Sequence, residues 1–126
     1  MHTMSISIDV PDLEAAVSFY TKGLGFKEVK KAGANMFILD TGTIKVYLLQ
    51  KAANSASTKF DTAPRNYARH WTPIHFDFDV VDLEKALKLV VAAGGIHEGG
   101  DAGDWGSIAY CSDPFGHGFC LIEEKK

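Results

Sequence analysis

The sequence has little of what marks secreted, membrane or nucleic-acid-binding proteins. Its only cysteines, Cys111 and Cys120, are too few for the disulfide framework of a small secreted domain, and we expect both to be reduced thiols. No apolar run approaches the ~20 residues that a bilayer-spanning helix needs. The net charge of -3 provides no excess of basic side chains for nucleic acid or for an anionic membrane. Residues 1–4 lack the basic and apolar regions of a signal peptide. We therefore expect a cytoplasmic protein with no nucleic-acid partner and no membrane partner.

The composition is that of an ordinary globular chain. Hydrophobic residues make up 46% of the 126 residues and charged residues 23%. This length is enough for one hydrophobic core but not for two independent domains. We expect residues 1–126 to form a single domain.

The chain repeats itself with an offset of 70 residues. Residues 9–17 read DVPDLEAAV and residues 79–87 read DVVDLEKAL, which are identical at six of nine positions. The same offset aligns the Leu24-Gly25-Phe26 corner with residues 94–96. A repeat of this kind predicts two copies of one structural unit. Two such copies, related by a pseudo-twofold axis, can form a pocket between them, and each residue facing it then has a counterpart in the other copy.

Each copy predicts one strand, one helix and three further strands. Residues 4–10 alternate between apolar and polar, Pro11 ends this strand, and Asp12 caps the helix that follows. In the second copy Asp82 caps the helix. The predicted strands are 4–10, 26–31, 36–40 and 44–50, then 73–80, 96–98, 105–112 and 118–123.

Between the copies, residues 51–70 are small and polar and read as a linker. The prediction is an α+β fold of two βαβββ modules in tandem, 1–50 and 71–126. Mixed sheets are expected to form a cup-like half-barrel with the helices on its outer face.

The two βαβββ modules, the repeated D-V-x-D-L-E-x-A pattern, the Leu24-Gly25-Phe26 corner and the sequence SDPFGHGFCLIE at residues 112–123 resemble one known group. It is the glyoxalase / bleomycin-resistance / extradiol-dioxygenase group, also called the vicinal oxygen chelate superfamily. The resemblance covers nearly the whole chain outside the linker. This scaffold hosts lyases, isomerases, dioxygenases and antibiotic-sequestering proteins, so function has to be argued from the site.

In metal-dependent members, the resemblance implies one ligand in the first strand and one in the last strand of each module. Histidine and carboxylate ligands suit a divalent ion that acts as a Lewis acid. The first-strand positions carry Ser5 and His75, and the last strand of the second module carries Cys120. The counterpart of Cys120 is Val46, or Tyr47 if the strand is shifted by one residue. The pattern is met at one position, or at two if a thiolate counts, so we predict no metal cofactor. If any divalent metal binds, His75 is its ligand.

His75 and Asp77 are the best catalytic candidates, because both lie on the polar face of the predicted strand 73–80. The alternative is a structural hydrogen bond between them. Cys120 is a candidate ligand contact or a small buried apolar residue. Arg65 and Arg69 could close over an anionic ligand or remain solvated. The predicted ligand-binding residues are Ser5, Phe37, Tyr47, His75, Asp77, Trp105 and Cys120, with Trp71, Tyr110 and His117 as further candidates.

We expect a protein with a degenerate metal site that binds a small organic ligand in the cup between the modules. The alternative is a metal-dependent enzyme, lactoylglutathione-lyase-like or dioxygenase-like, that uses His75 and non-standard ligands. A third hypothesis is metal-free acid–base chemistry by His75 and Asp77. The resemblance also implies a homodimer.

Overall fold

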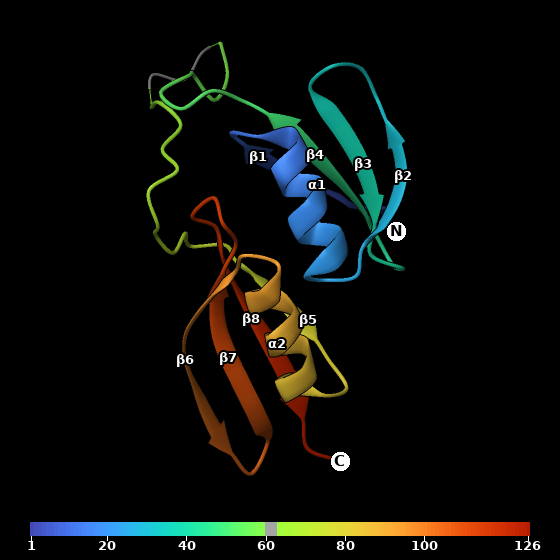
Figure 1. Cartoon of the computed structure of the whole chain (residues 1–126), viewed down its shortest axis with the longest axis vertical. Coiled ribbons are helices and arrows are strands. Elements are labelled where there is room, and N and C mark those ends of the chain that lie inside the picture. Colours follow the sequence, from blue (N-terminus) through green and yellow to red (C-terminus); the bar gives the residue numbers. More distant parts are fainter. Residues whose placement is uncertain (60–62) are drawn as a thin grey trace. The chain divides into compact units, whose positions relative to one another are not determined.

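Two compact units make up the chain in a computed structural model that describes residues 1–59 and 63–126. The first comprises Met1–Thr21 and Gly25–Tyr67, and the second comprises Lys22–Leu24 and Ala68–Lys126. Each unit contains one mixed sheet of four strands and one helix (Figure 1).

The first unit is a βαβββ module. The elements are β1 (Ser5–Val10), α1 (Leu13–Lys22), β2 (Lys27–Lys31), β3 (Met36–Asp40) and β4 (Lys45–Gln50). The strand order in the sheet is β1-β4-β3-β2, with β1 parallel to β4 and the other pairs antiparallel.

The second unit has the same topology. The elements are β5 (Phe76–Asp79), α2 (Leu83–Ala92), β6 (Ile96–Gly103), β7 (Gly106–Ser112) and β8 (Gly118–Glu124). The strand order in the sheet is β5-β8-β7-β6, with β5 parallel to β8 and the other pairs antiparallel. The predicted α+β fold of two tandem βαβββ modules is confirmed, with two separate open sheets.

Both helices begin in the same way. The Asp12 and Asp82 side chains each accept a hydrogen bond from a first-turn amide, as predicted for N-caps. A residue near the end of each module's last strand accepts from the first helical N–H: Gln50 Oε1 from Leu13, at 2.9 Å, and Glu123 Oε1 from Leu83, at 2.7 Å. The last strand therefore anchors the helix of its own module.

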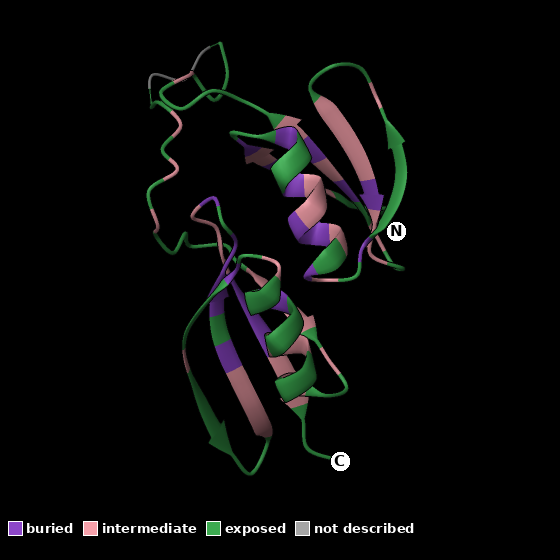
Figure 2. Ribbon diagram, viewed as in Figure 1, coloured by how far each residue is buried: buried purple, intermediate pink, exposed green. Residues whose placement is uncertain are grey.

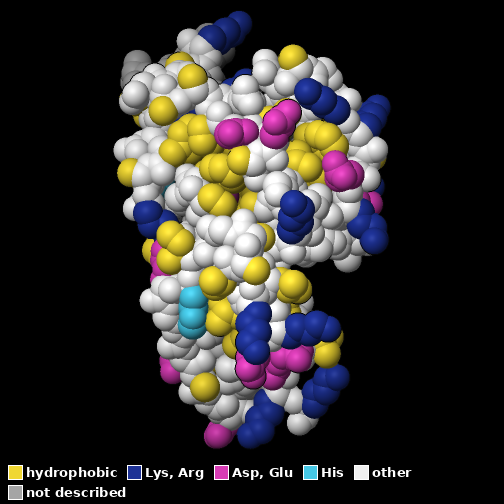
Figure 3. Space-filling model, viewed as in Figure 1, with side chains coloured by type: hydrophobic (Ala, Val, Ile, Leu, Met, Phe, Trp, Pro, Cys, Tyr) yellow, Lys and Arg dark blue, Asp and Glu magenta, His cyan; other side chains and the backbone are white. Residues whose placement is uncertain are grey.

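The two helices differ in burial (Figure 2). Four side chains of α1 are buried, and only Val90 is buried in α2, over which charged side chains gather at the surface (Figure 3). The first core is completed by sheet residues that are at most 5% exposed: Ile8, Val10, Leu39, Val46 and Leu48. Among the described residues, no helix is long and apolar enough to cross a membrane.

The strand predicted at 73–80 is shorter than expected, and this moves His75. Strand β5 begins at Phe76, so His75 lies just before the strand and not within it. Pro73 has no N–H to donate to a sheet, and the Thr72 hydroxyl turns back to donate to the Ile74 carbonyl. Ile74 is 79% exposed, although an alternating strand with His75 and Asp77 on its polar face predicts Ile74 on the apolar face.

The β6–β7 hairpin also differs from the prediction. Strand β6 extends to Gly103, five residues past the predicted end at Glu98, because it pairs along the whole of β7. Strand β7 begins at Gly106, so Trp105 lies in the turn that joins the two strands.

Arg65 organises the segment that was predicted as a linker. Its Nε donates to Asp9 Oδ2 of β1 at 2.7 Å, and its Nη1 donates to Ser55 Oγ at 3.2 Å. An isolated bridge joins Ala56 and Pro64. Arg65 is therefore a structural residue of the first unit. The part of the predicted linker at 60–62 lies outside the described residues.

Candidate functional site

The candidate site lies on one face of the second sheet. In β8, Phe119 and Leu121 point to one side of the sheet and Cys120 points to the other, because side chains alternate along a strand. Cys120 pairs with Asp77 of β5 and with Tyr110 of β7, so these three residues form a row across the sheet.

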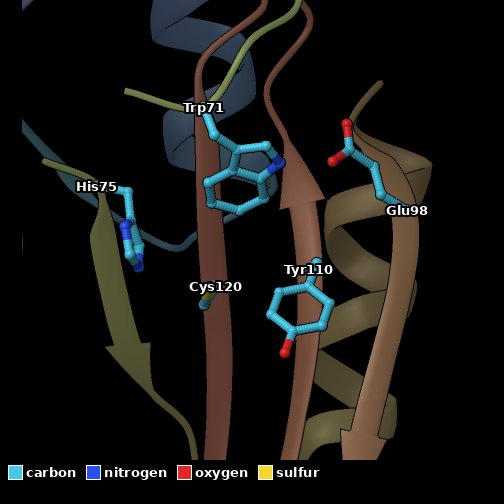
Figure 4. Close-up of a pocket in the computed structure, with 5 residues that line it drawn as sticks. All are labelled: Trp71, His75, Glu98, Tyr110 and Cys120. Carbon is cyan, nitrogen blue, oxygen red and sulfur yellow. The ribbon is translucent and has the colours of Figure 1, made fainter. Parts of the chain in front are cut away.

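A pocket of about 380 Å³ opens on this face. It is lined by Trp71, His75, Glu98, Tyr110 and Cys120 (Figure 4). All five lining residues belong to the second unit.

His75, Asp77 and Cys120 meet beside the pocket. The His75 Nε2 atom is 3.3 Å from Asp77 Oδ1, and the potential ligand atoms of all three residues lie within 4.8 Å of one another. Burial raises the pKa of the Cys120 thiol to about 11, and its hydrogen bond with the Asp77 carboxylate adds to this shift. Cys120 is therefore a protonated thiol at neutral pH and a poor nucleophile without a further group to activate it.

Trp71 forms a wall of the pocket. Its ring lies edge to face with those of His75 and Tyr110, at centroid distances of 5.4 and 6.3 Å. It packs over Gly118 of β8 so closely that a Cβ atom there would be 2.8 Å from Trp71 Cε3. The absence of a side chain at position 118 is what allows the indole to lie on the sheet.

Arg69, two residues before Trp71, packs its guanidinium against the indole. Its guanidinium carbon is 4.6 Å from the centroid of the Trp71 ring, and its Nε and Nη2 donate to the two carboxylate oxygens of Glu98. These hydrogen bonds lower the pKa of the Glu98 carboxyl. Arg69, which could have closed over an anionic ligand, is instead paired with Glu98.

Glu98 is the pocket residue that sequence reasoning missed. The ladder between β6 and β7 shifts register between His97 and Gly99, and Glu98 is the extra residue of that bulge. A signal was present in the sequence, since Gly99 and Gly100 interrupt a strand-like stretch and glycine in a strand often marks a bulge.

The candidates of the first module lie on both faces of its sheet. Ser7 pairs with Tyr47, as Asp77 pairs with Cys120, so Tyr47 and not Val46 is the counterpart of Cys120. The helix anchors give the same alignment, because Gln50 and Glu123 are also 73 positions apart. Ser5 is exposed at the start of β1.

Phe37 and Trp105 are not part of the pocket lining. Phe37 lies beside Leu13 and Val17 of α1, in a separate depression of about 250 Å³. Trp105 is 50% exposed in the β6–β7 turn. His117 is likewise absent from the lining, because its Nδ1 atom is 2.7 Å from Oδ2 of the buried Asp113, within the β7–β8 turn.

The two tandem βαβββ units with open mixed sheets define the class of protein as the vicinal oxygen chelate superfamily. Within this superfamily, the chain belongs to the family described as the glyoxalase-like domain, whose model matches residues 5–122. No curated protein matches the chain.

Solved structures show the same fold at low sequence identity. The fosfomycin resistance protein FosX from Listeria monocytogenes is 15% identical with a TM-score of 0.76, over 99% of this chain and 94% of that one. Lactoylglutathione lyase from Agrobacterium tumefaciens is 17% identical with a TM-score of 0.67, over 97% and 92%. A glyoxalase-related enzyme from Fulvimarina pelagi is 18% identical with a TM-score of 0.71, over 98% and 89%. At these identities the likeness establishes the fold alone.

Proposed function

We propose that this protein binds a small organic molecule in the pocket of the second module. The observation that carries the proposal is the aromatic wall formed by Trp71 and Tyr110 above the sheet. Binding pockets are typically concave and apolar with a few polar groups, and this one has the thiol of Cys120, the imidazole of His75 and the hydroxyl of Tyr110.

Preorganisation of Trp71 supports the same proposal. The indole is fixed by its contact with Gly118 and by the Arg69 guanidinium, which is itself held by Glu98. A side chain that is already ordered loses less conformational freedom when a ligand stacks against it. The arrangement holds Trp71 in place while leaving the residue 42% exposed to solvent.

The superfamily's metal positions give a further reason for a binding role. The first module supplies the Ser5 hydroxyl and Tyr47 in place of histidine and a carboxylate. Neither is a usual ligand for a divalent ion. The degenerate metal site therefore remains part of this proposal. The cytoplasmic location and the homodimer stay predictions from the sequence.

The proposal is tested with a flat neutral probe, 2-naphthamide. The chain contains two tryptophans, Trp71 in the pocket and Trp105 in the β6–β7 turn, and both indole N–H groups are visible in a proton–nitrogen correlation spectrum. We expect saturable shifts of the Trp71 signal, no shift of the Trp105 signal, and loss of binding in Trp71→Ala. Equal shifts of both indoles, or saturable binding that survives Trp71→Ala, would refute a site at this wall.

A second candidate function is metal-dependent catalysis, and the meeting of His75, Asp77 and Cys120 favours it. Nitrogen, oxygen and sulfur donors within 4.8 Å of one another fit a borderline divalent ion such as zinc or cobalt. These three side chains would hold the ion, and the ion would supply Lewis-acid chemistry at its remaining positions. His75 and Asp77 are exposed and can adjust, whereas Cys120 is buried and must lose its proton.

Cobalt titration separates this candidate from the first. A thiolate ligand gives Co²⁺ an intense near-ultraviolet charge-transfer band, so the band should appear with the native protein and disappear in Cys120→Ala. Cys111→Ala is the matched control, because Cys111 is also a buried free thiol and is not in the cluster. Absence of the band and of bound cobalt after gel filtration would exclude the metal site.

A further inference from the structure

The charges around the pocket do not cancel. Glu98 is paired with Arg69, so the two together contribute little net charge. Asp77 contacts two of the lining residues: its Oδ1 atom is 3.3 Å from His75 Nε2, and its carboxylate accepts from the Cys120 thiol. Among the described residues, Asp77 forms no ion pair with a lysine or an arginine. One carboxylate at the edge of the pocket is therefore left without a fixed cation.

The ring of Tyr110 favours a positive charge as well. The ring of Trp71 already has its cation, because the guanidinium carbon of Arg69 lies 4.6 Å from its centroid. The ring of Tyr110 stands perpendicular to it and is not covered by a cation among the described residues. The faces of aromatic rings carry negative electrostatic potential, and here they adjoin a carboxylate.

The same features disfavour an anion. Arg69 is a cation that contacts the pocket lining, and both of its donating edges are already used: Nε and Nη2 donate to Glu98, and Nη1 donates to the His70 carbonyl. A phosphonate or carboxylate ligand would have to break the Arg69–Glu98 pair and would leave the Glu98 carboxylate without its cation.

We propose that the ligand of this pocket is a flat organic cation, an amidinium, guanidinium or aromatic ammonium compound whose ring stacks on Tyr110, beside Trp71, while its charge lies near Asp77. This inference rests on the proposed binding function and specifies the chemical class of the ligand. It distinguishes this pocket from one built for acidic substrates.

The test uses three probes of one shape and different charge: 2-naphthamidinium, 2-naphthamide and 2-naphthoate. Each is titrated by calorimetry at pH 8 and low salt into protein dialysed against a chelator. Because a charge about 4 Å away is screened by water on one side, we expect the amidinium to bind about fivefold more tightly than the amide. The naphthoate should bind more weakly than the amide.

Two variants test the role assigned to the charge. Asp77→Asn keeps the shape of the side chain and should reduce the preference for the amidinium over the amide to within about twofold. Asp104→Asn changes the net charge of the protein equally, but in the exposed β6–β7 turn, and should leave the preference intact.

The outcomes separate the two levels of the proposal. Equal binding of amidinium and amide, tightest binding of the naphthoate, or a preference that persists in Asp77→Asn would refute the cation and leave the binding function standing. Failure of all three probes to bind would overturn the binding function together with this inference.

Discussion

A single methyl group at position 118 is expected to displace Trp71 from the pocket wall. In Gly118→Ala the new Cβ would lie 2.8 Å from Trp71 Cε3, 2.9 Å from Cδ2 and 3.0 Å from Arg69 Nη1. Ordinary van der Waals contact begins near 3.4 Å. The strand backbone cannot easily retreat, because Gly118 pairs with Ser112 in the ladder between β8 and β7. The indole and the guanidinium therefore have to move outward together.

The predicted effect on stability is small because two terms oppose each other. Gly118 lies outside the left-handed region, so alanine is compatible with its backbone and restricts the unfolded chain, a gain of about 0.4–1 kcal/mol. Overpacking costs about 1–3 kcal/mol, and a partly exposed indole that can swing away puts the cost at the low end of that range. We expect a net destabilisation of no more than about 1 kcal/mol, with the loss concentrated in the order of Trp71.

The assay combines fluorescence with a double-mutant cycle. In a Trp105→Phe background, Trp71 is the sole tryptophan, and its emission should shift to longer wavelength in Gly118→Ala as the indole enters water. Urea unfolding then compares Gly118→Ala in the presence of Trp71 and in Trp71→Ala. With the indole removed, the methyl group should be neutral or stabilising, which corresponds to a coupling of about 1 kcal/mol.

One result would refute this reasoning. If Gly118→Ala destabilised the protein equally with and without Trp71, the cost would come from the sheet itself, and the close contact between Gly118 and the indole would not position the wall. An unchanged emission maximum in the single-tryptophan protein would lead to the same conclusion.

Three further predictions address the titrating and buried groups. Burial raises the pKa of both Cys111 and Cys120 to about 11, so the folded state holds these protons more tightly than the unfolded state. The free energy of unfolding should therefore fall by on the order of 2 kcal/mol per thiol as the pH rises from about 9 to 11. Urea titrations of the variant with both cysteines replaced by alanine should show a smaller fall. Glu98→Gln should cost less than about 1 kcal/mol near neutral pH, because the pair with Arg69 is partly exposed, and this contribution should disappear as the pH falls through the lowered pKa of Glu98, measured by urea unfolding between pH 7 and 3. Asp113→Ala should destabilise by about 2–4 kcal/mol in thermal unfolding, since the buried carboxylate accepts from Phe115 N and His117 N, both at 2.9 Å, whereas Asp113→Asn should lose less because its carbonyl oxygen still accepts.

Much of the fold could be read from the sequence because its signals are local. The aspartate caps, the prolines and the alternation of apolar and polar residues each depend on only a few neighbouring residues. Because the chain is a repeat, most of these local patterns occur in both modules. The predicted βαβββ order is present in both units, and the N-caps at Asp12 and Asp82 are confirmed by their hydrogen bonds. The prediction failed at the ends of elements, where pairing partners decide: β5 starts late after Pro73, and β6 runs on to Gly103 opposite β7.

The candidate site was only partly readable. His75, Asp77 and Cys120 were identified from repeat positions, and the structure brings them within 4.8 Å of one another. Phe37 could not be placed from its pattern, because all five residues of β3 are apolar or partly buried and either face could have met the helix. The register with β4 decided that it lies on the α1 side.

The sequence by itself determined the two modules and the starts of their helices. It also showed that equivalent positions of the two modules differ in chemistry, with Ser5, Ser7 and Tyr47 in the first module and His75, Asp77 and Cys120 in the second. Only the tertiary structure decided that the second module has a pocket with a built wall. That wall depends on two contacts between residues far apart in sequence, Trp71 on Gly118 and Arg69 with Glu98, together with the local contact of Arg69 on Trp71. The periodicity of the sequence cannot predict these long-range contacts. They form between the bulge at Glu98, strand β8 and the segment that carries Arg69 and Trp71, which meet only once the sheet has formed.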